Sequence, residues 1–181
     1  MRSAAPGLPG GGIGFRPKDE GGRPVAGFAN GMGFLMGEIA VEVEQAYDAS
    51  PETVFAALAD YSAVRPTILA PEFTDFAVLE GGVGAGTRIS YRLHATKKRI
   101  RQVEAAVTEP EAGRTLQEAD QNSSMVVLWD VVPAGTGSKL TVRVNWQGAG
   151  GVGGFFERRF APAGIRRIYR TELDRLETAL A

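Results

Sequence analysis

Arg101 is the residue of this sequence whose type and position most directly suggest binding chemistry. It lies in the segment Arg99–Thr108, where Val103, Ala105 and Val107 alternate with mostly polar residues, as in a half-buried β-strand. Because Arg101 shares the parity of these three residues, its guanidinium is expected to point inward unless a bulge intervenes. A buried guanidinium needs a carboxylate, or the anionic or carbonyl end of a ligand. The alternative is that Arg101 lies near the open end of its strand and extends its charge into water.

Few other residues have the chemistry for catalysis or metal binding. Glu118 and Asp120 have inward parity on the following strand and are candidate partners of Arg101. His94, the only histidine, falls on the outward, basic face of its strand, which favours a surface residue over a catalytic base. With one histidine and no cysteine, the chain has neither the ligands of a multi-histidine or thiolate metal site nor the members of a hydrolase triad. The sequence therefore predicts no metal, no cofactor and no identifiable catalytic residue.

A second group of residues has the right chemistry to line a pocket for an apolar or aromatic guest. They are apolar or aromatic side chains at positions expected to face the interior, and the phenolic hydroxyls among them can orient a polar end. Each is also an ordinary core residue, so position alone leaves both interpretations open. Together with Arg101, the predicted ligand-binding residues are Tyr91, Leu93, Arg101, Val103, Trp146, Phe156, Phe160 and Tyr169.

The elements that must position these residues follow from the hydrophobic pattern. From Gly153 to Ala181, apolar residues recur at steps of mostly three and four with charged residues between them, as in a long amphipathic helix. Pro162 and Gly164 predict a kink or a restart within 161–164. The region 38–147 predicts seven short strands, with two short helices after the first strand.

The second of these short helices is expected as a turn over 61–64 that Pro66 closes, followed by a loop over 67–71. A single long helix that follows a run of strands needs a sheet to bury its apolar stripe. The predicted fold is therefore α+β, with a curved seven-stranded antiparallel sheet wrapped around a long C-terminal helix.

Composition sets further bounds on the class of protein. The chain has 181 residues, is 44% hydrophobic and carries a formal net charge of −1. The length and the hydrophobic fraction fit one domain with a real core. The net charge argues against a nucleic-acid partner, because domains that bind nucleic acid usually carry an excess of basic residues. No apolar run approaches the about 20 residues that span a bilayer, and the N-terminus shows no uninterrupted apolar signal segment, so a cytoplasmic location is expected. Residues 1–37 are rich in glycine and proline and are predicted to be disordered, with the domain at 38–181.

A basic stripe is expected on the hairpin around residue 97. Its members are Arg88, Arg92, Lys97, Lys98, Arg99 and Arg101. A stripe of this kind is either a solvated face or a contact for anionic lipid headgroups or an acidic protein. Few aromatic residues are interleaved with these charges, which disfavours single-stranded nucleic acid as a partner.

Four motifs in a fixed order resemble the helix-grip superfamily of START-like and polyketide cyclase/dehydrase-type domains. They are the opening helix in Ala49–Asp60, the glycine turn in Gly82–Arg88, the hairpin with Trp129–Pro133 and Gly137–Thr141, and the helix end Leu173–Leu176. Where members of this superfamily often have an aromatic residue after the first helix, this chain has Arg65-Pro66-Thr67. The resemblance implies the helix-grip fold with a cavity between sheet and helix, but not a single activity.

Three hypotheses follow from this resemblance. The first is a non-enzymatic domain that binds or transports a hydrophobic small molecule or lipid in the cavity, with Arg101, Tyr91 or Tyr169 orienting its polar end. The second is an enzyme that resembles polyketide cyclases or dehydratases and uses the same cavity. The third is a protein-interaction module. An acid/base pair that points into the cavity would favour the enzyme, and a purely apolar cavity would favour carriage. A collapsed cavity with an exposed apolar patch would favour the interaction module.

Overall fold

The computed structural model describes residues 38–96, 99–148 and 151–181, and within them all side chains except those of 95, 96, 99 and 151–160. The elements are β1 (Glu38–Tyr47), α1 (Pro51–Ala59), α2 (Arg65–Ile68), β2 (Phe73–Glu80), β3 (Arg88–Thr96), β4 (Arg99–Thr108), β5 (Thr115–Asp120), β6 (Val126–Ala134), β7 (Gly137–Gln147) and α3 (Gly151–Leu180). This order confirms the predicted strand, two short helices, six strands and long helix. The predicted disorder of 1–37 lies outside the described residues.

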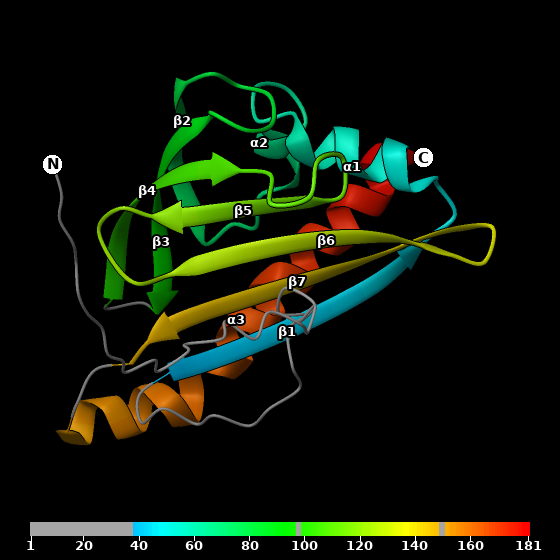
Figure 1. Ribbon diagram of the computed structural model, residues 1–181. Coiled ribbons are helices and arrows are strands. Elements are labelled where there is room, and N and C mark those ends of the chain that lie inside the picture. Colours follow the sequence, from blue (N-terminus) through cyan, green and yellow to red (C-terminus); the bar gives the residue numbers. More distant parts are fainter. Residues whose placement is uncertain (1–37, 97–98, 149–150) are drawn as a thin grey trace, which may run out of the picture. The chain divides into compact units, whose positions relative to one another are not determined.

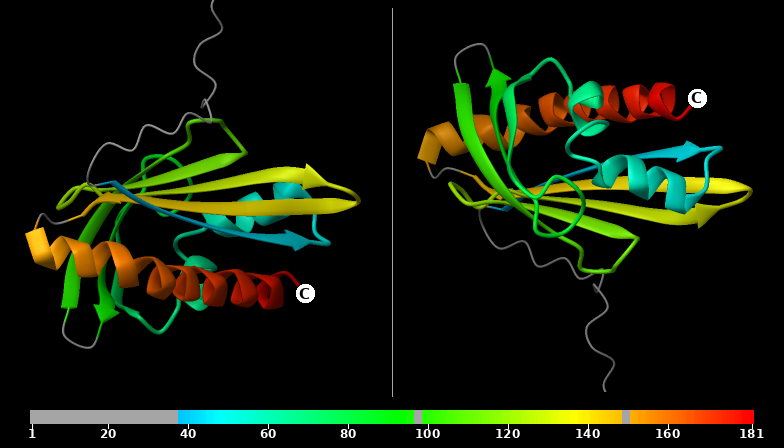
Figure 2. Two further views of the ribbon diagram at one scale, coloured as in Figure 1. Left: turned by 90° about the horizontal axis from the view of Figure 1, so that it is seen from below. Right: turned by 90° about the horizontal axis from the view of Figure 1, so that it is seen from above.

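The seven strands form one antiparallel sheet in the order β1-β7-β6-β5-β4-β3-β2. Every neighbouring pair is a hairpin along the chain except β1 with β7, so the first and last strands in sequence lie side by side. Figure 2 shows β2, β3 and β4 turned steeply relative to β1, β6 and β7, which curves the sheet around α3. The helix lies along one face of the sheet against β1, with α2 beside it (Figure 1). This arrangement confirms the predicted fold class.

Simple sequence signals account for the start of the domain. In β1, the buried side chains of Ile39, Val41 and Val43 alternate with exposed acidic and small residues. The hydroxyl oxygen of Ser50 accepts a hydrogen bond from the backbone N of Thr53 at 3.3 Å, and a proline follows at the first helical position of α1. These are the capping features that the sequence predicts.

The predicted turn over 61–64 is confirmed, but the second short helix lies after it, where the sequence predicts a loop from residue 67. The structure has a turn over 61–64 and then α2 over Arg65–Ile68, with Pro66 inside its first turn. Proline is tolerated there because the first N–H groups of a helix have no partner within the helix. Asp60 holds the preceding turn, since its Oδ1 accepts from the backbone N atoms of Ser62 and Ala63 at 3.0 and 2.8 Å. The shift matters because α2 carries Arg65 into the interior.

Of the kink or restart predicted within 161–164, the restart was wrong, and the kink stays a prediction. Helix α3 runs without interruption from Gly151 to Leu180, with Pro162 inside it. The apolar stripe of its described part, which includes Ile165, Ile168 and Leu176, is buried against the sheet and the short helices. Burial of that stripe stabilises the part of the helix that follows the proline.

A bulge in β2 places two phenylalanines on the inner side of the sheet. Thr74 pairs with Arg92 and Ala77 with Ser90, so β2 contains one extra residue relative to β3. Asp75 has φ 54, a left-handed conformation that aspartate tolerates better than most residues. Phe73 and Phe76, three positions apart, consequently both line the same pocket.

Candidate functional site

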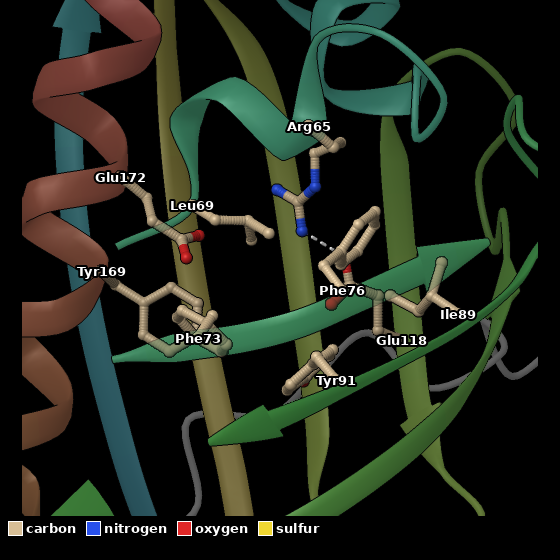
Figure 3. Close-up of a pocket in the computed structure, with 9 residues that line it drawn as sticks. All are labelled: Arg65, Leu69, Phe73, Phe76, Ile89, Tyr91, Glu118, Tyr169 and Glu172. Atoms are coloured by element: carbon tan, nitrogen blue, oxygen red, sulfur yellow. Dashed lines mark hydrogen bonds and ion pairs between the residues drawn. The ribbon is translucent and has the colours of Figure 1, made fainter. Parts of the chain in front are cut away.

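The candidate site is a small pocket between α2, α3 and the inner face of the sheet (Figure 3). Its space is about 240 Å³ and includes open solvent, whereas the centre of a water molecule can occupy only about 10 Å³ of it. That free volume corresponds to about one water molecule. The pocket combines an aromatic and aliphatic wall with charged side chains, and its lining residues are Arg65, Leu69, Phe73, Phe76, Ile89, Tyr91, Glu118, Tyr169 and Glu172.

Arg65 and Glu118 form a buried ion pair in this pocket. Nη2 of Arg65 lies 2.5 Å from Oε1 of Glu118, and both side chains are 4% exposed. The same carboxylate oxygen accepts from the hydroxyl of Tyr61 at 2.9 Å and from the indole N–H of Trp129 at 3.1 Å. The guanidinium carbon also lies 4.3 Å from the centroid of the Trp129 ring. Burial opposes the charge of Arg65, but Glu118 and its neighbours raise the pKa of Arg65 overall, so it stays a cation.

The guanidinium keeps donors that no described residue uses. Nε and Nη1 of Arg65 are buried and have no hydrogen-bond partner among the described residues. In Figure 3 the bonded nitrogen faces Glu118, and the other terminal nitrogen points toward the side of the pocket that holds Leu69 and Glu172. A buried donor without a partner costs about 1–3 kcal/mol and is rare in native proteins. A ligand with a carbonyl or carboxylate oxygen would satisfy it.

Glu172 brings a second carboxyl group to the pocket. It is 1% exposed on α3, and its Oε1 accepts from the backbone N of Ala70 at 3.4 Å. Burial raises the pKa of Glu172 to about 7, with Arg65 opposing the rise and Glu118 adding to it. This carboxyl group therefore changes its protonation near neutral pH, a property that is common in groups that transfer protons.

Aromatic rings line the pocket or, in the case of Trp129, contact the residues that line it. The ring of Phe73 meets Tyr91 edge to face with centroids 5.1 Å apart, and Trp129 meets Tyr169 in the same way at 5.6 Å. Burial raises the pKa values of Tyr91 and Tyr169 well above the ordinary value for a phenol, so both hydroxyls stay neutral and can donate. The pocket thus places aromatic and aliphatic side chains next to several polar groups.

The segment between α2 and β2 is tied to α3 beside the pocket. Arg175 donates to the carbonyl oxygen of Leu69, Glu172 accepts from Ala70, and Arg167 pairs with Glu72 at 3.1 Å. This segment leads directly into the bulged part of β2, and both pieces carry side chains that line the pocket. These contacts hold the segment against α3 where it forms one wall of the pocket.

Two of the residues predicted to bind ligand, Tyr91 and Tyr169, line the pocket. Three other predicted residues are buried in the core but do not line the pocket: Leu93, Val103 and Trp146. The side chains of the two remaining aromatic candidates lie outside the described residues, and these are Phe156 and Phe160. The structure therefore brings together only part of the predicted set.

Arg101 lies opposite Leu93 in the β3–β4 pairing and is half-buried, so it has the inward parity that the sequence predicts, but it does not line the pocket. Its two candidate partners have other roles. Glu118 binds Arg65. Asp120 accepts from the hydroxyl of Ser123 at 2.5 Å and stabilises the turn between β5 and β6.

The sequence interpretation missed Arg65 and Glu172, the two groups that give the pocket its chemistry. Glu172 had a detectable signal, because it lies three residues after Tyr169 and four before Leu176, on the apolar stripe of the helix. A charged residue in such a stripe is expected to be buried and therefore to have a specific partner. Arg65 had no comparable signal, since its inward direction depends on where α2 begins.

The structure also limits other kinds of site. Within the described residues, no group of three or more His, Cys, Asp and Glu side chains could hold a metal ion. None of the helices in that part of the chain is both long and apolar enough to span a membrane.

The fold and the pocket define a helix-grip protein with a partly polar inner pocket. Residues 38–181 match the family model described as "Polyketide cyclase / dehydrase and lipid transport", and the chain belongs to this family. No curated protein matches the chain.

Solved structures support the same assignment. The chain is similar to the KanY protein (ms6282), whose solution structure has 46% sequence identity, a TM-score of 0.73, and covers 80% of this chain and 99% of its own. It is also similar to TTHA0849 from Thermus thermophilus, with 16% identity and a TM-score of 0.66. That match covers 78% of this chain and 96% of TTHA0849. The match to Ara h 8.0201 has 15% identity and a TM-score of 0.57, and it covers 80% of this chain and 98% of Ara h 8.0201. The last two likenesses show the fold alone.

Proposed function

We propose that this protein binds a largely apolar small molecule or lipid in the pocket between the sheet and α3, with the polar end of the ligand at Arg65. The observation that carries this proposal is a buried guanidinium with two nitrogens that have no partner among the described residues, set in a wall of aromatic and aliphatic side chains. Burial of the apolar body would supply most of the binding free energy, and the guanidinium would fix the orientation. The family to which the chain belongs is consistent with this activity.

Binding requires the pocket to enlarge, because its present free volume is about that of one water molecule. The half-buried side chains of Leu69, Phe73 and Phe76 lie on the segment from α2 into β2, and they are the ones that can move at least cost. β2 is also an edge strand with a bulge, so only one neighbouring strand holds it. We therefore place the entry of the ligand at this segment.

The direct test is native mass spectrometry of protein purified from its source host, followed by organic extraction of whatever stays bound. A lipid, quinone or aromatic compound that copurifies in a defined ratio would support the proposal and identify its chemical class. A clean mass of the free protein, together with no thermal shift across a panel of lipids and aromatic acids, would contradict it.

Arg65→Lys is expected to weaken binding of such a ligand at least tenfold, because lysine lacks the planar fork of donors. The measurement is isothermal titration with the extracted compound. Arg101→Lys is the matched control, since this change is the same but falls on an arginine that does not line the pocket. A larger loss from Arg101→Lys than from Arg65→Lys would show that Arg101, which the sequence predicts as the orienting group, is the better assignment.

A second candidate function is a cyclase- or dehydratase-like enzyme, which is favoured by Glu172 with its pKa of about 7 in the pocket. In this function Arg65 would stabilise the enolate oxygen of a ketone substrate while Glu172 transfers the proton from the neighbouring carbon. The test is deuterium exchange at that carbon in a β-ketoacyl thioester. Exchange that depends on the protein and is lost in Glu172→Gln would favour the enzyme, and exchange at the uncatalysed rate would leave carriage as the function.

The predicted partners at the basic hairpin remain predictions. In the described part of this hairpin, Arg88 pairs with Glu80 and Glu104, and Arg92 with Asp75. These ion pairs reduce the positive potential that an anionic headgroup or an acidic protein would meet. We still expect a protein that acts in the cytoplasm without nucleic acid, as composition suggests.

A further inference from the structure

We propose that the polar end of the ligand is an acceptor oxygen, of a ketone or a carboxylate, held between the free terminal nitrogen of Arg65 and the protonated carboxyl group of Glu172, so that binding takes up a proton. This inference rests on the proposed function and specifies its ligand class. It assigns to Glu172 a role in selecting the ligand.

The geometry that supports this proposal joins two elements far apart in the sequence. Arg65 comes from α2 and Glu172 from α3, and both line the same pocket. In Figure 3 the unbonded terminal nitrogen of Arg65 points toward the part of the pocket that holds Glu172, and the side chain of Leu69 lies between the two groups. Nη2 is already engaged by Glu118, so Nη1 is the donor left for a ligand on this side. An oxygen that contacts both groups requires the half-buried side chain of Leu69 to move aside.

Hydrogen-bond chemistry then decides the protonation state of Glu172. An ionised carboxylate has only acceptor oxygens, and a ketone or carboxylate ligand brings only acceptors as well. Two such groups side by side in a buried pocket repel each other unless one of them carries a proton. With a proton on Glu172, its hydroxyl donates to the ligand, and Arg65 donates from the other side. The ligand oxygen is then satisfied by two donors.

The surroundings of Glu172 favour its protonated form near neutral pH. Burial raises its pKa to about 7 without ligand, so little free energy is needed to hold the proton near neutral pH. A ligand anion or carbonyl oxygen beside it would raise the pKa further. The charged and titratable groups that bear on Glu172 are Arg65 from α2, Glu118 from β5, Tyr91 from β3, and Tyr169 and Arg175 from α3 itself. Of these, only the two arginines favour the ionised form of Glu172.

The ligand class follows from this arrangement. Aromatic or aliphatic molecules that end in a ketone or a carboxylate gain two hydrogen bonds, while a hydrocarbon of the same size gains none. A ligand that ends in an ammonium group would bring only donors to Arg65, which also has only donors. Such ligands should be rejected, because the guanidinium would stay unpaired.

The experiment is isothermal titration of the full chain with three probes of similar size, naphthoate, acetylnaphthalene and naphthalene, between about pH 6 and about pH 9. The affinity of at least one of the two oxygen-bearing probes should be constant below about pH 7 and should fall by up to about tenfold per pH unit above it. Titration in two buffers of different ionisation enthalpy should show uptake of close to one proton at about pH 8. Naphthalene should bind with the same affinity throughout.

Glu172→Gln should remove the pH dependence, because the amide donates like the protonated acid at every pH. Glu177→Gln, the same change at an exposed position of the same helix, should behave as the unchanged protein. Binding of both oxygen-bearing probes without proton uptake would overturn this inference and leave the proposed function standing. If none of the three probes binds although a lipid or aromatic compound copurifies with the protein, this inference fails and the proposed function stands; if nothing copurifies either, both fail. A stronger effect for naphthoate would point to carboxylates, and a stronger effect for acetylnaphthalene to ketones.

Discussion

Replacing Glu118 by alanine is expected to lower the free energy of unfolding by about 3–5 kcal/mol, because it leaves the buried guanidinium of Arg65 without its counter-ion. The same replacement removes the acceptor for the hydroxyl of Tyr61 and the indole of Trp129, which are also buried. Chemical denaturation at neutral pH, followed by circular dichroism, measures the effect. We expect no other single substitution in the pocket to destabilise the fold more.

Glu104→Ala is the matched control for this prediction. Glu104 on β4 pairs with Arg88, but both side chains are substantially exposed, so the loss should stay below about 1 kcal/mol. Equal losses from Glu118→Ala and Glu104→Ala would contradict the assignment of Glu118 as the partner on which the buried charge depends.

A double variant separates the role of the buried pair in stability from its role in binding. Arg65→Met with Glu118→Gln removes both charges and keeps an oxygen that can accept from Tyr61 and Trp129. Replacing a buried ion pair by neutral groups of similar size is often neutral or stabilising. The double variant should therefore be far more stable than Glu118→Ala while it no longer binds a ligand through Arg65. That result would indicate that the pair is retained for recognition.

The second large effect concerns the dependence of stability on pH. The pKa of Glu172 is about 7 in the folded protein and 4.5 as a reference for the unfolded chain, so the folded state binds the proton more tightly. The contribution of this group to stability is therefore largest below about pH 4.5 and is lost as the pH rises through about 7. The difference corresponds to about 3 kcal/mol.

Glu172→Gln should remove this dependence, so that the variant becomes more stable than the unchanged protein above about pH 7 by up to about 3 kcal/mol. The measurement is the free energy of unfolding of both proteins from about pH 4 to about pH 9. The difference between the two isolates Glu172 from all other titrating groups. Glu177→Gln should show no such gain, because that carboxyl group is exposed. A difference that is flat with pH would contradict a buried carboxyl group with a raised pKa.

Both effects have their origin in a pocket that costs stability. A buried cation with unpaired donors and a buried carboxyl group that resists ionisation are both unfavourable for folding. Such groups are common where a protein binds or transforms a ligand, because the ligand supplies the missing partner.

The sequence alone determined the fold class and the order of the elements, but not the position of α2 or the continuity of α3. Strand alternation in β1, the Ser50 cap of α1 and the long amphipathic pattern of α3 are local signals, since each follows from the periodicity of one element. The inward parity of Arg101, Tyr91 and Leu93 could be predicted for the same reason. The order of the elements and four short motifs were then sufficient to recognise the helix-grip superfamily.

Only the tertiary structure decided which of these inward residues meet at one pocket. Arg65 faces the interior because α2 begins at that residue, and Phe73 and Phe76 share a side because one bulge at Asp75 shifts the register of β2. Glu118 has inward parity in the sequence, but its partner lies 53 positions away on another element. Periodicity reports on which face of its own element a residue lies, whereas a pocket depends on contacts between elements, and single-residue shifts in a turn or a strand redirect those contacts.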